Sequence, residues 1–263
     1  MLIAENMVVT LGQRPVLHGV DFTARPGEVT AIVGPNGSGK TTLLRALSGD
    51  LPFRGAASLN GMPIARTPVW QLAAMRAVLA QSTPVGFAFT VLEVVRLGLA
   101  SSANHEAAPR VALAQVGLAG YEARLFPELS GGEQARVHLA RVLVQLGTPT
   151  GPDGPRWLFL DEPVAALDIG HQLLVMRLAA AFAEAGGGVV AVLHDLNLTA
   201  QFAASTALLA EGGLVAQGPT TEVLSDSRLS AAYRCPIRLN VAPELGRWFL
   251  PQMAGAVPAG LPA

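Results

Sequence analysis

The stretch GPNGSGKTT, Gly34 to Thr42, constrains the fold more than any other part of the chain. It follows EVTAIVG, a short apolar run typical of a buried strand, and it leads into KTTLLRALSG, which has helical leucine spacing and ends at Gly49 as a predicted C-cap. The match to G-x-x-x-x-G-K-[ST] is complete: Gly34, Pro35, Asn36, Gly37, Ser38, Gly39, Lys40, Thr41. A strand, this loop and a helix, in that order, predict a P-loop that binds nucleotide phosphates.

The residue types in this loop suit phosphate chemistry. Its glycines let successive backbone N–H groups point at phosphate oxygens, and the helix N-terminus adds its positive dipole end. We expect Lys40 to reach the β- and γ-phosphates and the Thr41 hydroxyl to ligate Mg²⁺, with Thr42 completing the binding stretch. Lys40 is the only lysine in the chain. A GTPase is therefore not expected, because the Asn-Lys-x-Asp motif that normally recognises guanine would need a second lysine.

Composition further restricts what kind of protein this chain can be. The chain has 263 residues, which favours one domain with an inserted subdomain. Hydrophobic residues make up 51% and charged residues 14%, yet no apolar run reaches the ~18 residues of a membrane-spanning helix, so a soluble, cytoplasmic chain is expected. The net charge of -1 argues against nucleic-acid binding. The single cysteine, Cys235, excludes an internal disulfide, and we expect it to be buried and inert near a strand.

Strands alternate with helices along most of the chain. MLIAENMVVTL and VLHGVDFTA are expected as strands separated by the turn GQRP, GAASLNGMPI as a hairpin, and residues 83–147 as mainly helical. Strands are then expected at WLFLDEP, VVAVLHD and TALLAEGGLVAQG, with IGHQLLVMRLAAAFAEA as a helix. This order predicts an α/β fold with a mostly parallel sheet covered on both faces and an inserted helical block. GTPTGPDGP is interpreted as a linker and the tail 253–263 as disordered.

An acidic pair ends one of the predicted buried strands. Asp161, in WLFLDEP, follows four apolar residues and lies where ligands bind in open α/β sheets. It is placed to hold Mg²⁺ through water, and the adjacent Glu162 to polarise an attacking water as a general base. The alternative is a pair of acids that caps the next helix. The P-loop in the same chain favours the first interpretation.

A second predicted phosphate-binding site occurs in LSGGEQARVHLAR. Ser130, Gly131, Gly132 and Glu133 lead into a predicted helix, whose N-terminal backbone donors suit a phosphate. One chain thus carries two predicted phosphate-binding sites for a single nucleotide. We infer that the second one serves the nucleotide of a partner subunit.

The P-loop, LSGGE, LFLDEP and a histidine after a strand, in this order, resemble the nucleotide-binding domain of ABC transporters over roughly residues 2–220. The resemblance implies a single ABC domain, 1–263, with a RecA-like core at about 1–82 and 148–218 and an antiparallel N-terminal β-subdomain. It also implies a helical subdomain at about 83–147 and a C-terminal segment at 219–263.

The same resemblance implies the catalytic residues. Gln81, in VLAQS, matches the glutamine that senses the γ-phosphate and Mg²⁺ and couples to a membrane partner. His194, in VLHDL, matches the histidine that contacts the γ-phosphate. Together with Glu162 and Lys40 they are the expected catalytic set for ATP hydrolysis. The expected Mg²⁺ site is Thr41, Gln81 and Asp161.

The family works as a head-to-tail homodimer with two ATP molecules between the subunits, so Ser130 to Glu133 are expected to contact the partner's ATP. AALD, Ala165 to Asp168, matches the D-loop at that interface, but Ala165 stands where serine is usual. Leu11 stands where an aromatic residue usually stacks on adenine. Stacking is therefore expected to be weaker, or supplied by Arg14.

Other segments resemble one branch of the family. LHDLNLTAQFA is similar to importers of ferric siderophores, cobalamin and haem, and STPVGFAFTVLEVVRLG, GTPTGPDGPRWLFLDEP and FLPQ resemble the haem-importer branch. This implies an ATPase bound at the cytoplasmic side of the bacterial inner membrane with two permease subunits and, indirectly, a periplasmic haem-binding protein. A siderophore or cobalamin importer is one alternative. A soluble ABC ATPase of iron–sulfur cluster assembly is an alternative of another class.

The cargo is expected to pass only through the membrane partner. His18, His105, His138 and His171 show no paired spacing for haem ligation, so no direct haem binding is expected. A coupling helix of the permease is expected to dock on QSTPVGFAF, an apolar stretch next to Gln81.

Overall fold

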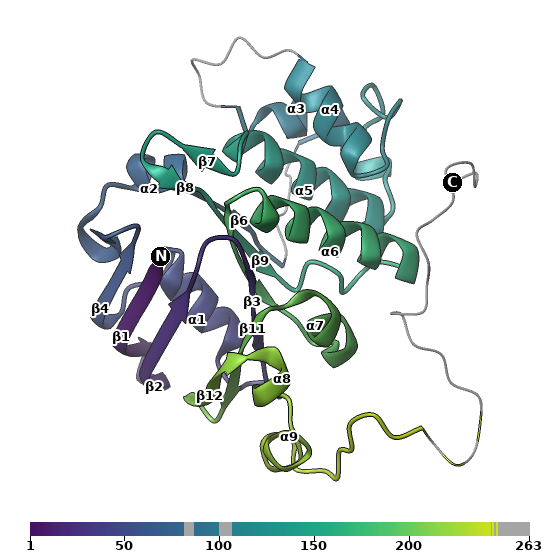
Figure 1. The fold of residues 1–263 in the computed structure, drawn as a ribbon. Helices are drawn as coiled ribbons and strands as arrows, with labels where there is room; N and C mark the ends of the chain where they lie inside the picture. Colours follow the sequence, from purple (N-terminus) through teal and green to yellow (C-terminus); the bar gives the residue numbers. More distant parts are fainter. Residues whose placement is uncertain (82–86, 100–106, 243, 245, 247–263) are drawn as a thin grey trace.

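A six-stranded sheet with the order β12-β11-β3-β10-β9-β6 forms the centre of the protein (Figure 1). The strands β3 (Val29–Val33), β9 (Trp157–Asp161) and β10 (Gly188–Val192) are buried at every residue. Their pairing with β6 (Arg76–Leu79) and β11 (Ser205–Ala210) is parallel throughout. Burial on both faces explains why these strands are mainly apolar along their length instead of alternating between apolar and polar residues.

The structure is a computed structural model that describes residues 1–263 except 82–86, 100–106, 243, 245 and 247–263. The tail 253–263 and part of the QSTPVGFAF stretch therefore lie outside the described residues. Among the described residues, no helix is both long and apolar enough to cross a membrane.

The two faces of the central sheet pack on different elements. Trp157 and Phe159 of β9 join a core with α1 (Lys40–Leu47), whereas Leu158 and Leu160 join the core formed with the helices on the opposite face. The alternation follows from the two-residue period of a strand. The expected sheet with both faces covered is confirmed.

A four-stranded antiparallel sheet, β2-β1-β4-β5, packs on the other side of α1. It consists of β1 (Leu2–Leu11), β2 (Arg14–Ala24), β4 (Arg54–Leu59) and β5 (Met62–Pro63). The expected strands and hairpin are confirmed. The first turn is shorter than expected, because β2 already begins at Arg14.

The helices of the inserted block gather away from the N-terminal sheet (Figure 1). They are α3 (Val91–Arg96), α4 (Ala107–Gln115) and α5 (Gly131–Leu146), with a 3-10 turn, η2, at Phe126–Glu128. Capping boxes begin α3 and α5: Thr90 pairs with Glu93, and Ser130 pairs with Glu133. Further along the chain are α6 (Ile169–Glu184), α7 (Leu196–Phe202), α8 (Thr220–Val223) and α9 (Asp226–Tyr233).

Several sequence expectations were wrong in detail. TALLAEGGLVAQG forms two antiparallel strands, β11 and β12 (Gly213–Pro219), because Glu211 and Gly212 both adopt positive φ and make a tight turn. The stretch taken as a linker contains the small hairpin β7 (Thr150–Gly151) and β8 (Gly154–Pro155). The pattern also gave no sign of α2 (Val69–Met75), of β6 or of the 3-10 turn η1 (Ile64–Arg66).

Cys235 is exposed, so the expectation of a buried cysteine was wrong. The residue follows Arg234, which ends α9 in the left-handed conformation and turns the chain away from the helix. Cys235 therefore begins an exposed connection instead of packing beside a strand.

Candidate functional site

The P-loop has backbone geometry that only glycine can adopt at two positions. Gly34 has φ +148°, and a Cβ on it would lie 2.1 Å from the Leu209 carbonyl oxygen. Gly39 has φ +100°, and a Cβ there would lie 2.7 Å from Leu17 Cδ2. Gly39 is also the N-cap of α1 and provides no side-chain cap, so the first N–H groups of the helix face the loop interior. This arrangement suits an anion.

Lys40 lies inside this loop and bonds to it. Its Nζ donates to the carbonyl oxygens of Gly34, at 2.9 Å, and Pro35, at 3.0 Å. The residue is 6% exposed. Burial lowers the pKa of Lys40, while the carboxylates of Glu162 and Asp161 act in the opposite direction. The loop carbonyls thus aim the ammonium group at the place where a phosphate would lie.

Thr41 and Asp161 meet across the base of the site. Thr41 Oγ1 donates to Asp161 Oδ1 over 3.0 Å, which ties the start of α1 to the carboxyl end of β9. Asp161 is buried, and burial raises the pKa of its carboxyl group, opposed chiefly by the hydrogen bond from Thr41. A buried carboxylate at this position favours a cation that would compensate its charge.

Glu162 is held by two side chains from neighbouring strands. Gln81 Nε2 donates to Glu162 Oε2 over 2.8 Å, and His194 Nε2 lies 2.6 Å from Glu162 Oε1. Glu162 also has φ +51°, an unfavourable conformation for a residue with a side chain. Backbone strain of this kind is typical of functional sites.

These residues enclose one pocket of about 370 Å³. It is lined by Asn36, Gly37, Gly39, Lys40, Thr41, Gln81, Glu162 and His194. Asp161 adjoins it through Thr41, Ser38 of the loop is buried, and Thr42 is partly buried in the first turn of α1. The structure therefore brings the four residues expected to be catalytic to one place, together with the P-loop.

A second pocket, of about 480 Å³, lies at the N-termini of α5 and α6. Ser130 N donates to Glu133 Oε2 over 2.8 Å, and Glu133 N donates to Ser130 Oγ over 3.3 Å. The backbone and hydroxyl hydrogen bonds of Ser130 lower the pKa of Glu133. The pocket is lined by Ser130, Gly131, Gly132, Glu133, Arg136, Ala166, Leu167, Asp168 and His171. It shares no lining residue with the P-loop pocket.

The D-loop stretch contributes the other wall of this second pocket. Asp168 caps α6, because its Oδ1 accepts from His171 N at 2.9 Å and its Oδ2 contacts His171 Nδ1 at 2.8 Å. Ala165 N donates to Glu162 O over 3.3 Å, so the general-base candidate and the D-loop belong to one turn.

Two residues of the second pocket were not anticipated from the sequence. Arg136 lies one and a half turns into α5 and donates from Nη1 to Val116 O at 3.0 Å. His171 lies three residues after Asp168. The helical offsets from Ser130 and from Asp168 would have placed both side chains near the helix starts, but neither residue type signals phosphate chemistry by itself.

Leu11, at the end of β1, is 46% exposed and lines neither of these two pockets. Arg14 pairs with it across the first turn of the N-terminal sheet. The structure thus leaves both residues available at the surface and assigns adenine to neither.

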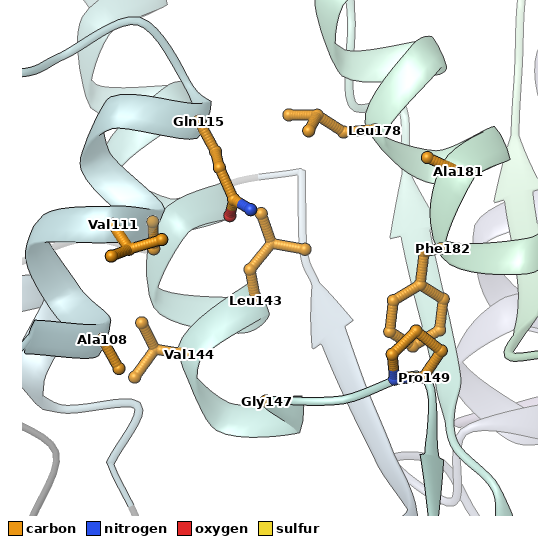
Figure 2. A pocket seen from close by; sticks show the side chains of 11 residues that line it. Ala108, Val111, Gln115, Leu143, Val144, Gly147, Pro149, Leu178, Ala181 and Phe182 are labelled. Carbon is orange, nitrogen blue, oxygen red and sulfur yellow. The ribbon is translucent and has the colours of Figure 1, made fainter. Parts of the chain in front are cut away.

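An apolar groove of about 390 Å³ lies apart from both polar pockets (Figure 2). Figure 2 shows Val111 and Gln115 from α4, Leu143 from α5, and Leu178 and Phe182 from α6 on its walls. No ionisable side chain lines it. It therefore contributes nothing to phosphate chemistry.

The profile of the family described as ABC transporter matches residues 17–165, which include the P-loop, the Ser130 motif, Asp161 at the end of β9 and Glu162 directly after it. The chain belongs to the ABC transporter family. It is an ATP-binding protein, and the α/β fold with a P-loop that the sequence predicted is confirmed.

The relatives are similar over nearly their whole length. A hemin import ATP-binding protein, HmuV, of Jannaschia sp. is 54% identical over 97% of this chain and 95% of its own. A protein of the same name from Roseobacter denitrificans is 57% identical over 92% and 94%. The resemblance to the haem-importer branch is confirmed by these relatives.

Solved structures give the same fold. An ATP-binding subunit of an ABC transporter superposes with a TM-score of 0.74 at 23% identity, covering 89% of this chain and 96% of its own. A bacterial Atm1-family ABC exporter with ATP bound superposes with a TM-score of 0.75 at 27% identity, over 88% of this chain and 40% of its own. Both support the ABC cassette fold.

Proposed function

We propose that this chain is the ATP-hydrolysing subunit of an importer that carries haem into a bacterial cell. The proposal is carried by the site geometry together with relatives at 54% and 57% identity that are named hemin import ATP-binding proteins and match along nearly the whole chain. The domain division into a core at about 1–82 and 148–218, a helical subdomain at about 83–147 and a segment at 219–263 belongs to the same proposal.

The P-loop pocket supplies the parts that hydrolysis needs. Backbone N–H groups of the loop and the α1 N-terminus bind the phosphates, and Lys40 places its charge between them. Glu162 takes a proton from the attacking water, and Gln81 and His194 fix the orientation of its carboxylate before that step. His194 also lines the pocket, where it can contact the γ-phosphate.

The donors in this pocket fit Mg²⁺. Thr41 and Asp161 place a hydroxyl and a carboxylate 3.0 Å apart, and Gln81 uses its amide nitrogen for Glu162, so that its oxygen is the atom available to a cation. Mg²⁺ prefers one or two such protein oxygens together with water and phosphate oxygens, which is the number that Thr41, Asp161 and Gln81 can offer. When bound, the ion neutralises charge on the β- and γ-phosphates.

The two separate pockets favour a head-to-tail homodimer. Ser130 to Glu133 cannot complete the P-loop pocket of their own chain, because they line a different pocket with no residue in common. A second copy, turned to face the first, would set its Ser130 pocket against the Lys40 pocket and enclose one ATP on each side. ATP binding then closes the pair, and hydrolysis reopens it.

The partner in the membrane is a permease, present as two subunits, with a periplasmic haem-binding protein acting upstream. The ATPase lies at the cytoplasmic side of the inner membrane, and QSTPVGFAF is the permease contact. Within that stretch the structure describes Gln81 and the residues from Phe87 on, and Phe87 is 74% exposed. An exposed phenylalanine six residues after Gln81 in the sequence suits a docked apolar helix.

Reconstitution tests the cargo. The chain is combined with its permease and binding protein in liposomes, and ATPase activity is measured with haem, a ferric siderophore or cobalamin. Stimulation by haem alone is the expected result, and stimulation by a siderophore with haem silent would overturn the cargo assignment.

Co-purification tests whether the protein is a transporter subunit or a soluble assembly ATPase. Recovery in a detergent-dependent complex with a permease supports transport, and recovery in a fully soluble assembly complex contradicts it.

A further inference from the structure

A carboxylate lines the pocket that is proposed to receive the partner's ATP. Glu133 shares this second pocket with Ser130 and the two glycines between them, at the N-terminus of α5. The backbone N–H groups there suit an anion, whereas a carboxylate repels the negative charges of a polyphosphate. The pocket therefore needs a positive group that offsets Glu133.

Glu133 is fixed in its place and in its charged form. Its Oε2 accepts hydrogen bonds from Ser130 N and from Ser130 Oγ, both at 2.8 Å, as part of the capping box that begins α5. The same hydrogen bonds lower the pKa of Glu133, and the positive charge of Arg124 acts in the same direction. The negative charge therefore stays at the N-terminus of α5 at neutral pH.

Arg124 lies at the other oxygen of this carboxylate. Its Nη1 is 3.7 Å from Glu133 Oε1, so Ser130 and Arg124 each contact a different oxygen of the acid. The Arg124 side chain is 44% exposed and the Glu133 side chain 18%, so solvent screens the pair only in part. Arg124 is therefore placed to offset the charge that Glu133 brings to the pocket.

Contacts other than the one with Glu133 also set the position of Arg124. Its Cζ lies 4.3 Å from the centroid of the Tyr121 ring, a distance at which a cation and an aromatic face attract each other. Arg124 N donates to Tyr121 O over 3.0 Å, and Val91 N, at the start of α3, donates to Arg124 O over 2.9 Å. These contacts do not depend on the charge of Glu133.

The remaining charged groups of the pocket do not replace Arg124. Asp168 is the second acid, and its Oδ2 contacts His171 Nδ1 at 2.8 Å. Arg136 is 8% exposed and, within the part of the chain that the structure describes, takes part in no ion pair. Arg124 is thus the cation that pairs with Glu133, and the positive charge of Arg136 remains for an incoming phosphate.

We propose that Arg124 is a positioning residue for the second pocket: as the counter-ion of Glu133, it offsets the repulsion between this carboxylate and the partner's ATP and lets the Ser130 end of α5 bind the phosphates. The inference rests on the proposed homodimer. The two polar pockets of one chain share no lining residue, so Arg124 affects the ATP-bound dimer and not the affinity of a single chain for nucleotide.

The stability of the ATP-bound dimer measures this effect. Every sample is the full-length chain with Glu162→Gln, so that ATP stays bound, and the dimer dissociation constant is determined by sedimentation velocity with saturating ATP and Mg²⁺. Arg124→Gln removes the charge and keeps part of the side-chain stem. We expect the dissociation constant to rise about 3- to 30-fold, because a partly exposed ion pair contributes up to about 5-fold and the symmetric dimer contains two of them.

Arg110→Gln is the matched control. Arg110, in α4, also forms a partly exposed ion pair, with Glu122, and neither residue lines the second pocket. The dimer dissociation constant of this variant should equal that of the parent chain.

Replacement of the carboxylate distinguishes a counter-ion from a structural ion pair. Glu133→Gln also breaks the pair, but it takes the repulsion away, so we expect a dimer at least as tight as that of the parent chain. Adding Glu133→Gln to Arg124→Gln should restore the dissociation constant to within about twofold of the parent value. Added NaCl should narrow the difference between Arg124→Gln and the parent, because salt screens the repulsion.

Three results would overturn the inference. An Arg124→Gln dimer as tight as the parent dimer would show that Glu133 needs no counter-ion. Equal weakening by Glu133→Gln and Arg124→Gln, or no recovery in the double variant, would make the ion pair purely structural. In both cases the homodimer stands, whereas a parent chain that forms no ATP-dependent dimer would overturn the proposed homodimer and this inference with it.

Discussion

Gln81 and Glu162 lie 81 residues apart in the sequence, yet Gln81 Nε2 donates to Glu162 Oε2 over 2.8 Å. The contact forms because β6 and β9 are parallel neighbours whose carboxyl ends reach the same edge of the sheet. His194 occupies the other carboxylate oxygen. Each oxygen of the proposed base thus has one partner that fixes its orientation, and each keeps a second lone pair that can accept a hydrogen bond from an attacking water.

Replacing the base should separate binding from turnover. In Glu162→Gln the P-loop and Lys40 are unchanged, so ATP still binds, but the amide cannot accept a proton. We expect kcat for ATP hydrolysis to fall by about 10²- to 10⁴-fold, the usual contribution of general base catalysis. The ATP-bound variant should also accumulate as a dimer in size-exclusion chromatography. Glu184→Gln, at the end of α6, is the control, and hydrolysis by Glu162→Gln at the unmodified rate would disprove the assignment.

His194 should affect turnover more than affinity. His194→Ala removes the contact at 2.6 Å that orients Glu162 and leaves the phosphate-binding loop intact. We expect kcat to fall by at least about 10-fold while KM for ATP changes less, because a misoriented base acts mainly in the transition state. Steady-state ATPase assays measure both constants. His18→Ala, an exposed histidine of β2, is the control, and a rise in KM at constant kcat would instead make His194 a simple binding residue.

The elements that the sequence predicted well have their own start and stop signals. α5 begins at the Ser130 capping box, and β3, which is apolar except for Thr30, stops at Gly34, so local sequence signals define both elements. β6 lacks such signals. It has four residues and begins with Arg76, whose burial depends on Asp50 in a distant loop. A polar residue that is buried by a tertiary ion pair cannot be recognised from periodicity.

The functional site likewise has one part that the sequence predicts and another part that depends on contacts made only in the folded protein. The P-loop and the two acids at the end of β9, Asp161 and Glu162, follow from sequence motifs and from the order of the strands. The second pocket required the fold, because it forms only where the start of α5 meets the D-loop: a Cβ on Gly132 would lie 3.2 Å from Ala166 O. Arg136 and His171 became visible as pocket residues only through that contact. The small hairpin at 150–155 likewise depends on a distant partner, since Asn60 Nδ2 donates to Pro155 O.

The ion pair between Arg76 and Asp50 should stabilise the core. Arg76 Nη2 donates to Asp50 Oδ1 over 3.0 Å, and Arg76 Nε donates to Ser48 O over 2.5 Å. Asp50→Ala would leave a largely buried guanidinium without its carboxylate, and the expected loss of unfolding free energy is about 1–3 kcal/mol. Urea denaturation should show a lower midpoint at an unchanged slope.

A matched control for this prediction is the pair between Arg110 and Glu122, whose arginine is 61% exposed. Glu122→Ala should change the unfolding free energy by less than about 1 kcal/mol, as is usual for surface pairs. Equal effects of the two variants would contradict the special role of Arg76 at the start of β6.

Acid should weaken the fold partly through the carboxylates that cap helices. Backbone hydrogen bonds from Ser130 and His171 lower the pKa of Glu133 and Asp168 below their ordinary values. A lowered folded-state pKa means that the stabilisation is complete above the unfolded pKa, about 4 for these groups, and is lost as pH falls through the folded value.

Glu133→Gln tests that sign. The amide oxygen can still accept the hydrogen bonds of the capping box, so the cost at pH 7 should stay below about 1 kcal/mol. The variant cannot gain a proton, however, and its unfolding free energy should therefore fall less than that of the unmodified chain between pH 6 and about pH 3. Urea denaturation at a series of pH values measures the difference. Parallel pH curves for the two proteins would show that Glu133 is not held in its charged form by Ser130.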